Sequence, residues 1–117
     1  MQVQGETADP ASVDLVFSAL ANPTRRRVVE RLSGSPASVS ELAEPFDMAL
    51  PSFVQHLKVL EESGLVSSHK EGRVRTYRLN SEPLRVAEGW LDRQRALWEA
   101  RLDRFDAYVT KLKENEP

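Results

Sequence analysis

The sequence predicts a mainly α-helical fold with one small β-hairpin and a long C-terminal helix. Three stretches carry this prediction. Between 49 and 66, apolar residues recur every three or four positions, the spacing of one buried helix face. From 67 to 79, two segments that favour extended backbone flank a turn at Gly72. From 84 to about 113, apolar residues recur at near-heptad spacing, which predicts a single helix of roughly 45 Å.

Length and composition predict one domain. The chain has 117 residues, 40% of them apolar, so its core is modest and leaves room for further burial against a partner subunit. Residues 1–11 show no periodicity and predict a flexible tail, which leaves 12–117 as the domain. No apolar run approaches the length of a membrane helix, and the N-terminus lacks the apolar centre of a signal peptide. We therefore expect a cytoplasmic protein.

The composition argues against an enzyme. The chain has no cysteine, which excludes disulfides, thiolate ligands and thiol catalysis. It has only two histidines, His56 and His69, and neither stands beside an evident carboxylate partner. No glycine-rich nucleotide loop is present. We predict no catalytic residue, no cofactor and no metal site.

Two helices are expected before residue 33. Ser12 can cap the first, whose apolar positions suit a core or a dimer contact. Asn22 can cap the second, in which Pro23 occupies the first turn, where its missing N–H costs nothing. The arginines at 25–27 and 31 have two interpretations, contact with phosphate or an ordinary solvated face. Because three consecutive residues span about 200° of a helix, we favour the solvated face for most of them.

The centre of the chain predicts a helix-turn-helix. Ser38 and Glu41 match a capping box and begin a short helix. A second helix follows over 50–63, and Gly64 can end it because glycine tolerates left-handed backbone angles. Two short helices joined by a tight turn form a helix-turn-helix. Together with the hairpin, these elements predict a winged helix-turn-helix with a long C-terminal dimerisation helix.

Charge is concentrated locally although the formal net charge is only −2. Between 69 and 78, four cations stand against one carboxylate, a local excess of +3. This hairpin is either an ordinary solvated tip or a site for the phosphates of double-stranded DNA. In the last helix, positive and negative side chains are equal in number and flank the apolar stripe. This pattern favours pairing between subunits over phosphate binding.

Taken together, the ordered elements resemble the ArsR (ArsR/SmtB) family of bacterial winged-helix regulators. The resemblance covers about 13–112 and is carried by LANPTRRRVVERL at 20–32, SVSELAEPFDM at 38–48, QHLKVLEESGLV at 55–66 and KEGRVRTYRLN at 70–80. It implies a homodimeric transcriptional regulator that binds a palindromic operator, usually represses, and releases DNA when an inducer binds. The alternative is a winged-helix module that binds another protein without specific DNA binding.

The sequence departs from the metal sensors of that family. Their cysteine motif falls on the helix that here reads SELAEPF, and their other site uses histidine on the last helix, where this chain has none. The chain is similar to the non-metal branch often encoded beside START-like (SRPBCC) proteins. The resemblance therefore implies an unknown non-metal signal.

The recognition helix and the hairpin supply the expected DNA contacts. Gln55 can make a bidentate contact to adenine, and Leu50 and Val54 can pack against thymine methyl groups. At the hairpin, Arg73 and Arg75 are expected to enter the adjacent minor groove, with Lys70 and Arg78 on the DNA backbone. His56 has two open interpretations, contact with a phosphate or partial burial with one ring nitrogen bonded to backbone. The candidate residues are Leu50, Pro51, Ser52, Val54, Gln55, His56, Lys58, Lys70, Arg73, Arg75 and Arg78.

The first and last helices supply the expected dimer interface. Its candidates are Val13, Val16, Phe17, Leu20, Trp90, Leu91, Leu97, Trp98, Leu102, Phe105, Val109 and Leu112. The aromatic seam has two interpretations, buried helix contact, which we favour, or a small-molecule effector site between subunits. Tyr77 and Leu79 are expected to anchor their strand rather than to touch DNA.

Overall fold

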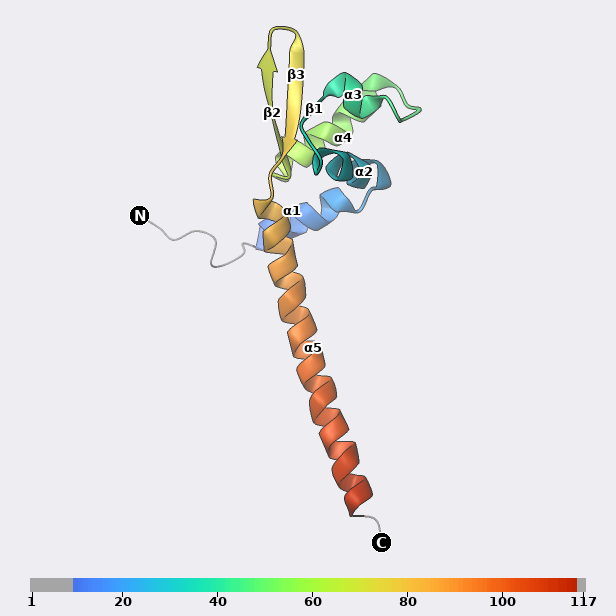
Figure 1. The fold of residues 1–117 in the computed structure, drawn as a ribbon, viewed down its shortest axis with the longest axis vertical. Coiled ribbons are helices and arrows are strands. Elements are labelled where there is room, and N and C mark those ends of the chain that lie inside the picture. Colours follow the sequence, from blue (N-terminus) through green and yellow to red (C-terminus); the bar gives the residue numbers. More distant parts are fainter. Residues whose placement is uncertain (1–9, 116–117) are drawn as a thin grey trace, which may run out of the picture. The chain divides into compact units, whose positions relative to one another are not determined.

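The computed structural model describes residues 10–115 and contains five helices and three strands in that part of the chain. In order they are α1 (Pro10–Leu20), α2 (Pro23–Leu32), β1 (Ala37–Ser38), α3 (Val39–Ala43), α4 (Leu50–Glu62), β2 (Val66–Glu71), β3 (Val74–Leu79) and α5 (Glu82–Glu114) (Figure 1). The mainly helical fold with a hairpin wing and a long last helix confirms the predicted fold class. The chain divides into two compact units, up to Ala87 and from Glu88, which we describe separately.

Most predicted boundaries agree with the structure to within two residues. Helix α1 begins at Pro10, before the predicted cap at Ser12, and α5 begins at Glu82 rather than at 84. The predicted flexible tail falls largely on residues 1–9, which lie outside the described part of the chain.

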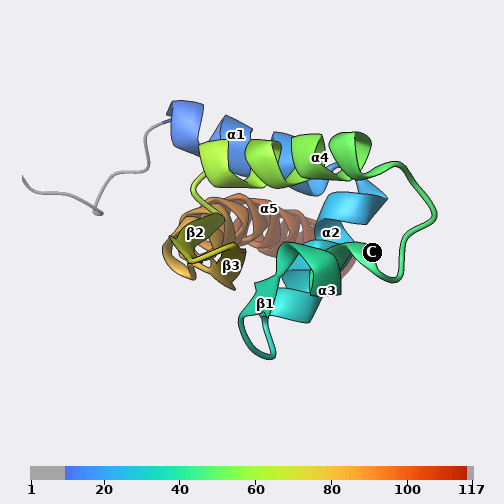
Figure 2. The ribbon, with the colours of Figure 1, turned by 90° about the horizontal axis from the view of Figure 1, so that it is seen from above.

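The core of the first unit forms around α4. Phe53, Leu57 and Leu60 are completely buried, as their spacing predicts. They join a cluster that includes Val28 of α2 and Leu42 of α3. Helix α1 packs against α2 and α4, and α1 and α4 run next to each other when the molecule is seen from above (Figure 2). The buried face of α4 thereby fixes the direction in which its opposite face points.

The hairpin belongs to a three-stranded antiparallel sheet with the order β1-β3-β2. The sequence prediction missed β1, where Ala37 pairs with Tyr77 and Ser38 with Thr76. A strand of two residues is too short to show an alternating pattern. Burial explains its position, because Ala37 is 2% exposed and Tyr77 is 4% exposed. The predicted role of Tyr77 as a strand anchor is confirmed.

Local hydrogen bonds define where the elements begin and end. Asn22 caps α2 by accepting from the Arg25 backbone N–H at 3.1 Å. The capping box of α3 is complete: the Glu41 N–H donates to Ser38 Oγ at 3.2 Å, and the Ser38 N–H donates to Glu41 Oε1 at 2.8 Å. Gly64 has a φ of 82°, which confirms its role in ending α4.

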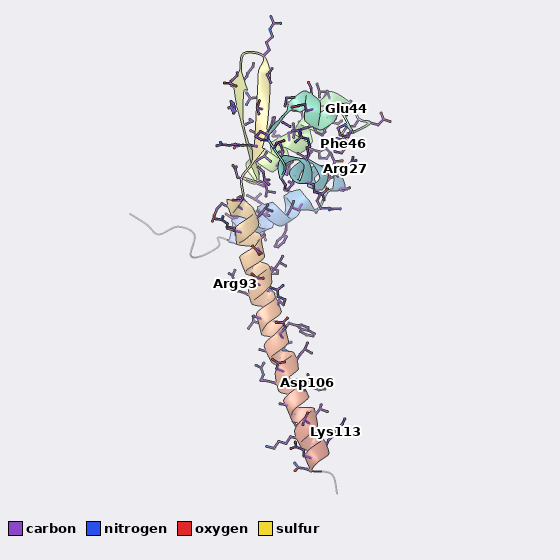
Figure 3. The ribbon with its side chains drawn as sticks, viewed as in Figure 1. Arg27, Glu44, Phe46, Arg93, Asp106 and Lys113 are labelled. Atoms are coloured by element: carbon purple, nitrogen blue, oxygen red, sulfur yellow. The ribbon has the colours of Figure 1, made fainter. Side chains whose placement is uncertain are left out.

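The second unit consists of the distal part of α5. Its exposed side chains include Leu91, Leu97, Trp98, Leu102, Phe105, Tyr108 and Leu112. Charged residues such as Arg93, Asp106 and Lys113 also lie along this helix (Figure 3). No helix in residues 10–115 is long and apolar enough to cross a membrane.

Candidate nucleic-acid interface

The outer surface of α4 carries three ridges of side chains. Leu50, Val54 and Lys58 lie four residues apart on one ridge, and Leu50 and Val54 are 55% and 41% exposed. Ser52 and His56 lie on the opposite flank. Between the flanks are the exposed residues Pro51 and Gln55. The face therefore presents two apolar side chains beside an amide, a combination that can contact base edges in a major groove.

His56 is half-buried and contacts a guanidinium. Its Nδ1 lies 3.0 Å from an Nη atom of Arg25 on α2. The same guanidinium donates from Nε to the Ala19 carbonyl at 2.8 Å and from its other Nη to the Ser18 carbonyl at 3.2 Å. Burial lowers the pKa of His56 below its ordinary value, and the positive charge of Arg25 adds a smaller effect in the same direction. The predicted partial burial is present, but the ring nitrogen has a side-chain partner instead of backbone.

The other arginines of α2 also have partners within the chain. Arg26 donates to the Leu20 carbonyl at 2.8 Å, and Arg31 donates to the Ser35 carbonyl at 3.1 Å. Arg27 lies over the ring of Phe46, and the two side chains come together between α2 and the segment after α3 (Figure 3). The sequence prediction of a solvated face was incomplete, since these side chains tie neighbouring segments together.

One face of the wing pairs two cations. Lys70 of β2 stands opposite Arg75 of β3 in the antiparallel register. An Nη atom of Arg75 donates to Ser68 Oγ at 2.9 Å, and that hydroxyl donates to Glu61 Oε2 of α4 at 2.8 Å. The chain of bonds links the wing to the end of α4. Lys70 and Arg75 therefore project from a face that is tied to the recognition helix.

The other face of the wing carries Arg78. Its Nε donates to Ser67 Oγ at 3.1 Å, on the residue opposite it in the register. His69 and Glu71 share this face, with 3.7 Å between His69 Nε2 and Glu71 Oε1. Arg73 lies at the exposed hairpin turn beside Gly72. The four predicted wing cations are therefore divided: Lys70 and Arg75 share one face, Arg78 lies on the other, and Arg73 lies at the tip.

Several residues that shape this surface carried no signal in the sequence. Ser67, Ser68 and Glu61 act through cross-strand register or through the distance between α4 and β2, which a linear pattern does not show. Asn80 donates from its amide to the Gly64 carbonyl at 2.9 Å and closes the base of the wing. Within residues 10–115 there is no group of three or more His, Asp and Glu side chains that could hold a metal ion.

Known proteins resemble this chain in sequence and in fold. Residues 20–69 match a family model described as a helix-turn-helix domain. The crystal structure of the ArsR family transcriptional regulator RHA00566 is 55% identical, covers 78% of this chain and 94% of its own, and superposes with a TM-score of 0.75. The chain belongs to the ArsR family of transcriptional regulators.

Two further relatives are transcriptional regulators by name. The regulator Rv2034 of Mycobacterium tuberculosis is 42% identical over 70% of this chain and 77% of its own length. The transcriptional repressor SdpR of Bacillus subtilis is 33% identical over 65% of this chain and 84% of its own length. Both names agree with the predicted class of function, regulation of transcription.

Proposed function

We propose that this ArsR-family chain is a homodimeric repressor that binds a palindromic operator and releases it in response to a non-metal signal. The observation that carries the proposal is the position of α4: its outer face exposes Leu50, Val54 and Gln55, and hydrogen bonds tie its last turn to the cationic face of the wing. A base-contacting helix beside a cationic hairpin suits a major groove and the adjacent backbone.

On α4, each ridge has a distinct proposed role. Gln55 donates to and accepts from the edge of adenine, while Leu50 and Val54 pack against thymine methyl groups. Ser52 and Lys58 contact phosphates on the two sides of the groove, which fixes register without specifying sequence. Pro51 contacts the groove at the helix start. These assignments favour an A·T-rich half-site.

On the wing, the pairing of Lys70 with Arg75 supports phosphate binding. Like charges directly opposite on a sheet are destabilising, and a phosphate between them removes that cost. We propose that Arg73 at the tip enters the minor groove, where a narrow A·T-rich stretch attracts arginine. Arg75, which the sequence also assigned to the minor groove, is proposed to contact the phosphate beside Lys70 instead. Arg78, on the other face, remains a candidate for a neighbouring backbone phosphate.

The proposed dimer uses the exposed stripe of α5. Leu91, Trp98, Phe105 and Leu112 recur every seventh residue, so they share one face of the helix. Gln94 and Arg101 interrupt this face, also seven residues apart. A polar side chain in such a seam sets register and partner number at some cost in stability. The two interruptions therefore favour one specific alignment of two copies over unspecific association.

Helix α1 contributes less to the proposed interface than the sequence suggested. Val13 and Val16 are buried in the chain itself, and Leu20 packs against the core. Phe17 is 36% exposed, and Leu15, which lies outside the predicted set, is 49% exposed. We therefore place Phe17 and Leu15, rather than the two valines, at the contact with the second copy.

Two features support a repressor with a non-metal signal. SdpR, the Bacillus subtilis relative described above, is a transcriptional repressor. The chain has no cysteine to serve as a thiolate ligand. A small-molecule effector between subunits would contact Trp90, Leu97, Trp98 or Phe105 of α5.

Selection from a pool of randomised duplexes tests the proposal. The full chain should enrich a two-fold symmetric sequence whose half-sites are about one helical turn, ~10 bp, apart. On that duplex and on a scrambled duplex, Arg73→Ala should weaken binding and lower the salt slope by about one unit per monomer. If no sequence is enriched while a partner protein co-purifies with the chain, the protein-interaction alternative replaces the proposal.

A further inference from the structure

We propose that Arg25 is a positioning residue for DNA binding, which holds His56 so that the ring Nε2–H donates to a phosphate at the edge of the groove. This inference rests on the proposed role of α4 as the recognition helix. It adds a neutral phosphate donor to that helix and assigns Arg25 a function that acts through His56 instead of through its own charge.

Each of the three guanidinium nitrogens of Arg25 makes one contact within the chain. Nε donates to the Ala19 carbonyl at 2.8 Å, one Nη donates to the Ser18 carbonyl at 3.2 Å, and the other Nη contacts His56 Nδ1 at 3.0 Å. The two carbonyls belong to the last turn of α1, where carbonyls lack partners within the helix. Arg25 therefore joins three helices and uses three of its five guanidinium N–H donors inside the chain.

This contact fixes the tautomer of His56. An arginine guanidinium has five N–H donors and no acceptor, so His56 Nδ1 must accept and cannot carry a hydrogen. The hydrogen of the neutral ring is therefore on Nε2. A protonated ring would place an N–H against the guanidinium and would lose the bond. Arg25 thus selects the neutral ring with a single donor.

That donor is open to solvent. Within residues 10–115, His56 Nε2 has no hydrogen-bond partner, whereas every buried side-chain nitrogen or oxygen there has one. Nε2 is therefore not a buried atom. Nε2 is consequently accessible to a ligand. His56 shares a flank of α4 with Ser52, beside the exposed ridge that carries Gln55. Ser52 is a proposed phosphate contact, so its neighbour on the same flank, His56, is close to the expected path of the DNA backbone.

A double-mutant cycle tests whether Arg25 acts through His56. The probe is a scrambled duplex, because a phosphate contact does not depend on sequence. Arg25→Ala and His56→Ala should each weaken binding about tenfold, the loss expected for one hydrogen bond to a charged group. The double variant should bind the scrambled duplex with the same affinity as His56→Ala. If the two losses multiply, Arg25 acts independently of His56 and the inference is wrong.

The salt dependence separates positioning from direct contact. Because Arg25 does not touch phosphate and His56 is neutral, neither substitution should change the salt slope. A slope lower by about 0.9 in Arg25→Ala would show a direct phosphate contact and would contradict the inference.

Arg26→Ala is the matched structural control. Arg26 also holds a carbonyl at the end of α1, that of Leu20 at 2.8 Å, and does not contact His56. The Arg26→Ala variant should bind DNA with unchanged affinity. An equal loss in Arg26→Ala and Arg25→Ala would show that the end of α1, and not the His56 ring, matters for binding.

Nitrogen NMR of the imidazole supplies a readout that does not depend on DNA. In the unsubstituted chain His56 should show an unprotonated Nδ1 and a protonated Nε2. In Arg25→Ala, the His56 ring should populate both neutral tautomers, and its pKa should rise because the neighbouring positive charge is gone. An Nδ1–H tautomer in the unsubstituted chain would overturn the inference. Failure of the duplex selection alone would instead count against sequence-specific repression, because the scrambled-duplex cycle does not use a selected site.

Discussion

The guanidinium carbon of Arg27 lies 4.6 Å from the centroid of the Phe46 ring. Phe46 in turn packs 5.3 Å from Phe53, with the two rings inclined by 34°. Phe46 belongs to the segment between α3 and α4, while Phe53 belongs to the buried face of α4. The stack therefore ties α2 to the turn of the helix-turn-helix and holds that turn against the recognition helix.

Loss of this stack should weaken the fold slightly. Arg27→Ala should lower the free energy of unfolding by about 0.5–1 kcal/mol, the range for an exposed cation–π contact. Urea denaturation measures the change, with Glu30→Ala at another exposed position of α2 as the control. In a Phe46→Leu background the cost of Arg27→Ala should disappear. The same cost in both backgrounds would contradict the cation–π interpretation.

The capping box of α3 gives a second prediction. Ser38→Ala removes the Oγ that accepts from the Glu41 N–H and should cost about 1 kcal/mol of unfolding free energy. Ser40→Ala changes an exposed serine in the same helix and should have a smaller effect. Chemical denaturation compares the two variants. If both lose the same stability, the cap does not set the start of the helix-turn-helix.

His56 should make stability depend on pH between neutral and mildly acidic conditions. Burial and the Arg25 charge lower the pKa of His56 below 6.5, so the unfolded chain binds the proton more readily. The stability linked to the neutral ring is therefore complete above pH 6.5 and is lost as the pH falls through the pKa of the folded state. Urea midpoints measured against pH should show this loss.

His56→Gln should flatten that dependence, while His69→Gln on the exposed wing should preserve it. Glu41 does not interfere, because hydrogen bonds from the Ser38 backbone and side chain lower its pKa below 4.5. An unchanged profile in His56→Gln would assign the pH effect to another group.

The dimer proposal predicts different outcomes on the two sides of α5. Trp98→Asp puts a charge in the apolar stripe and should convert dimers to monomers in sedimentation velocity. Ala96→Asp introduces the same charge about 200° around the helix and should leave the dimer intact. Dissociation in both variants, or in neither, would show that the apolar stripe of α5 is not the dimer interface.

The sequence predicted the features that depend on local pattern. The period of Phe53, Leu57 and Leu60 identified the buried face of α4, and Gly64 identified its end. The strand β1 was missed because its two residues are too few to alternate. The contact between Arg25 and His56 joins positions 31 residues apart and depends on the packing of α1, α2 and α4, so no local spacing could reveal it. The division of the wing cations between two faces became clear only with the strand register.

The most direct test of sequence reading by α4 is the ratio of Kd values for a scrambled duplex and the duplex enriched by selection. Gln55→Ala should reduce this ratio by about tenfold, because a bidentate contact to adenine contributes about 1–3 kcal/mol of discrimination. Its affinity for the scrambled duplex should stay close to that of the unsubstituted chain. An equal loss of affinity for both duplexes, with an unchanged ratio, would contradict base reading by this helix.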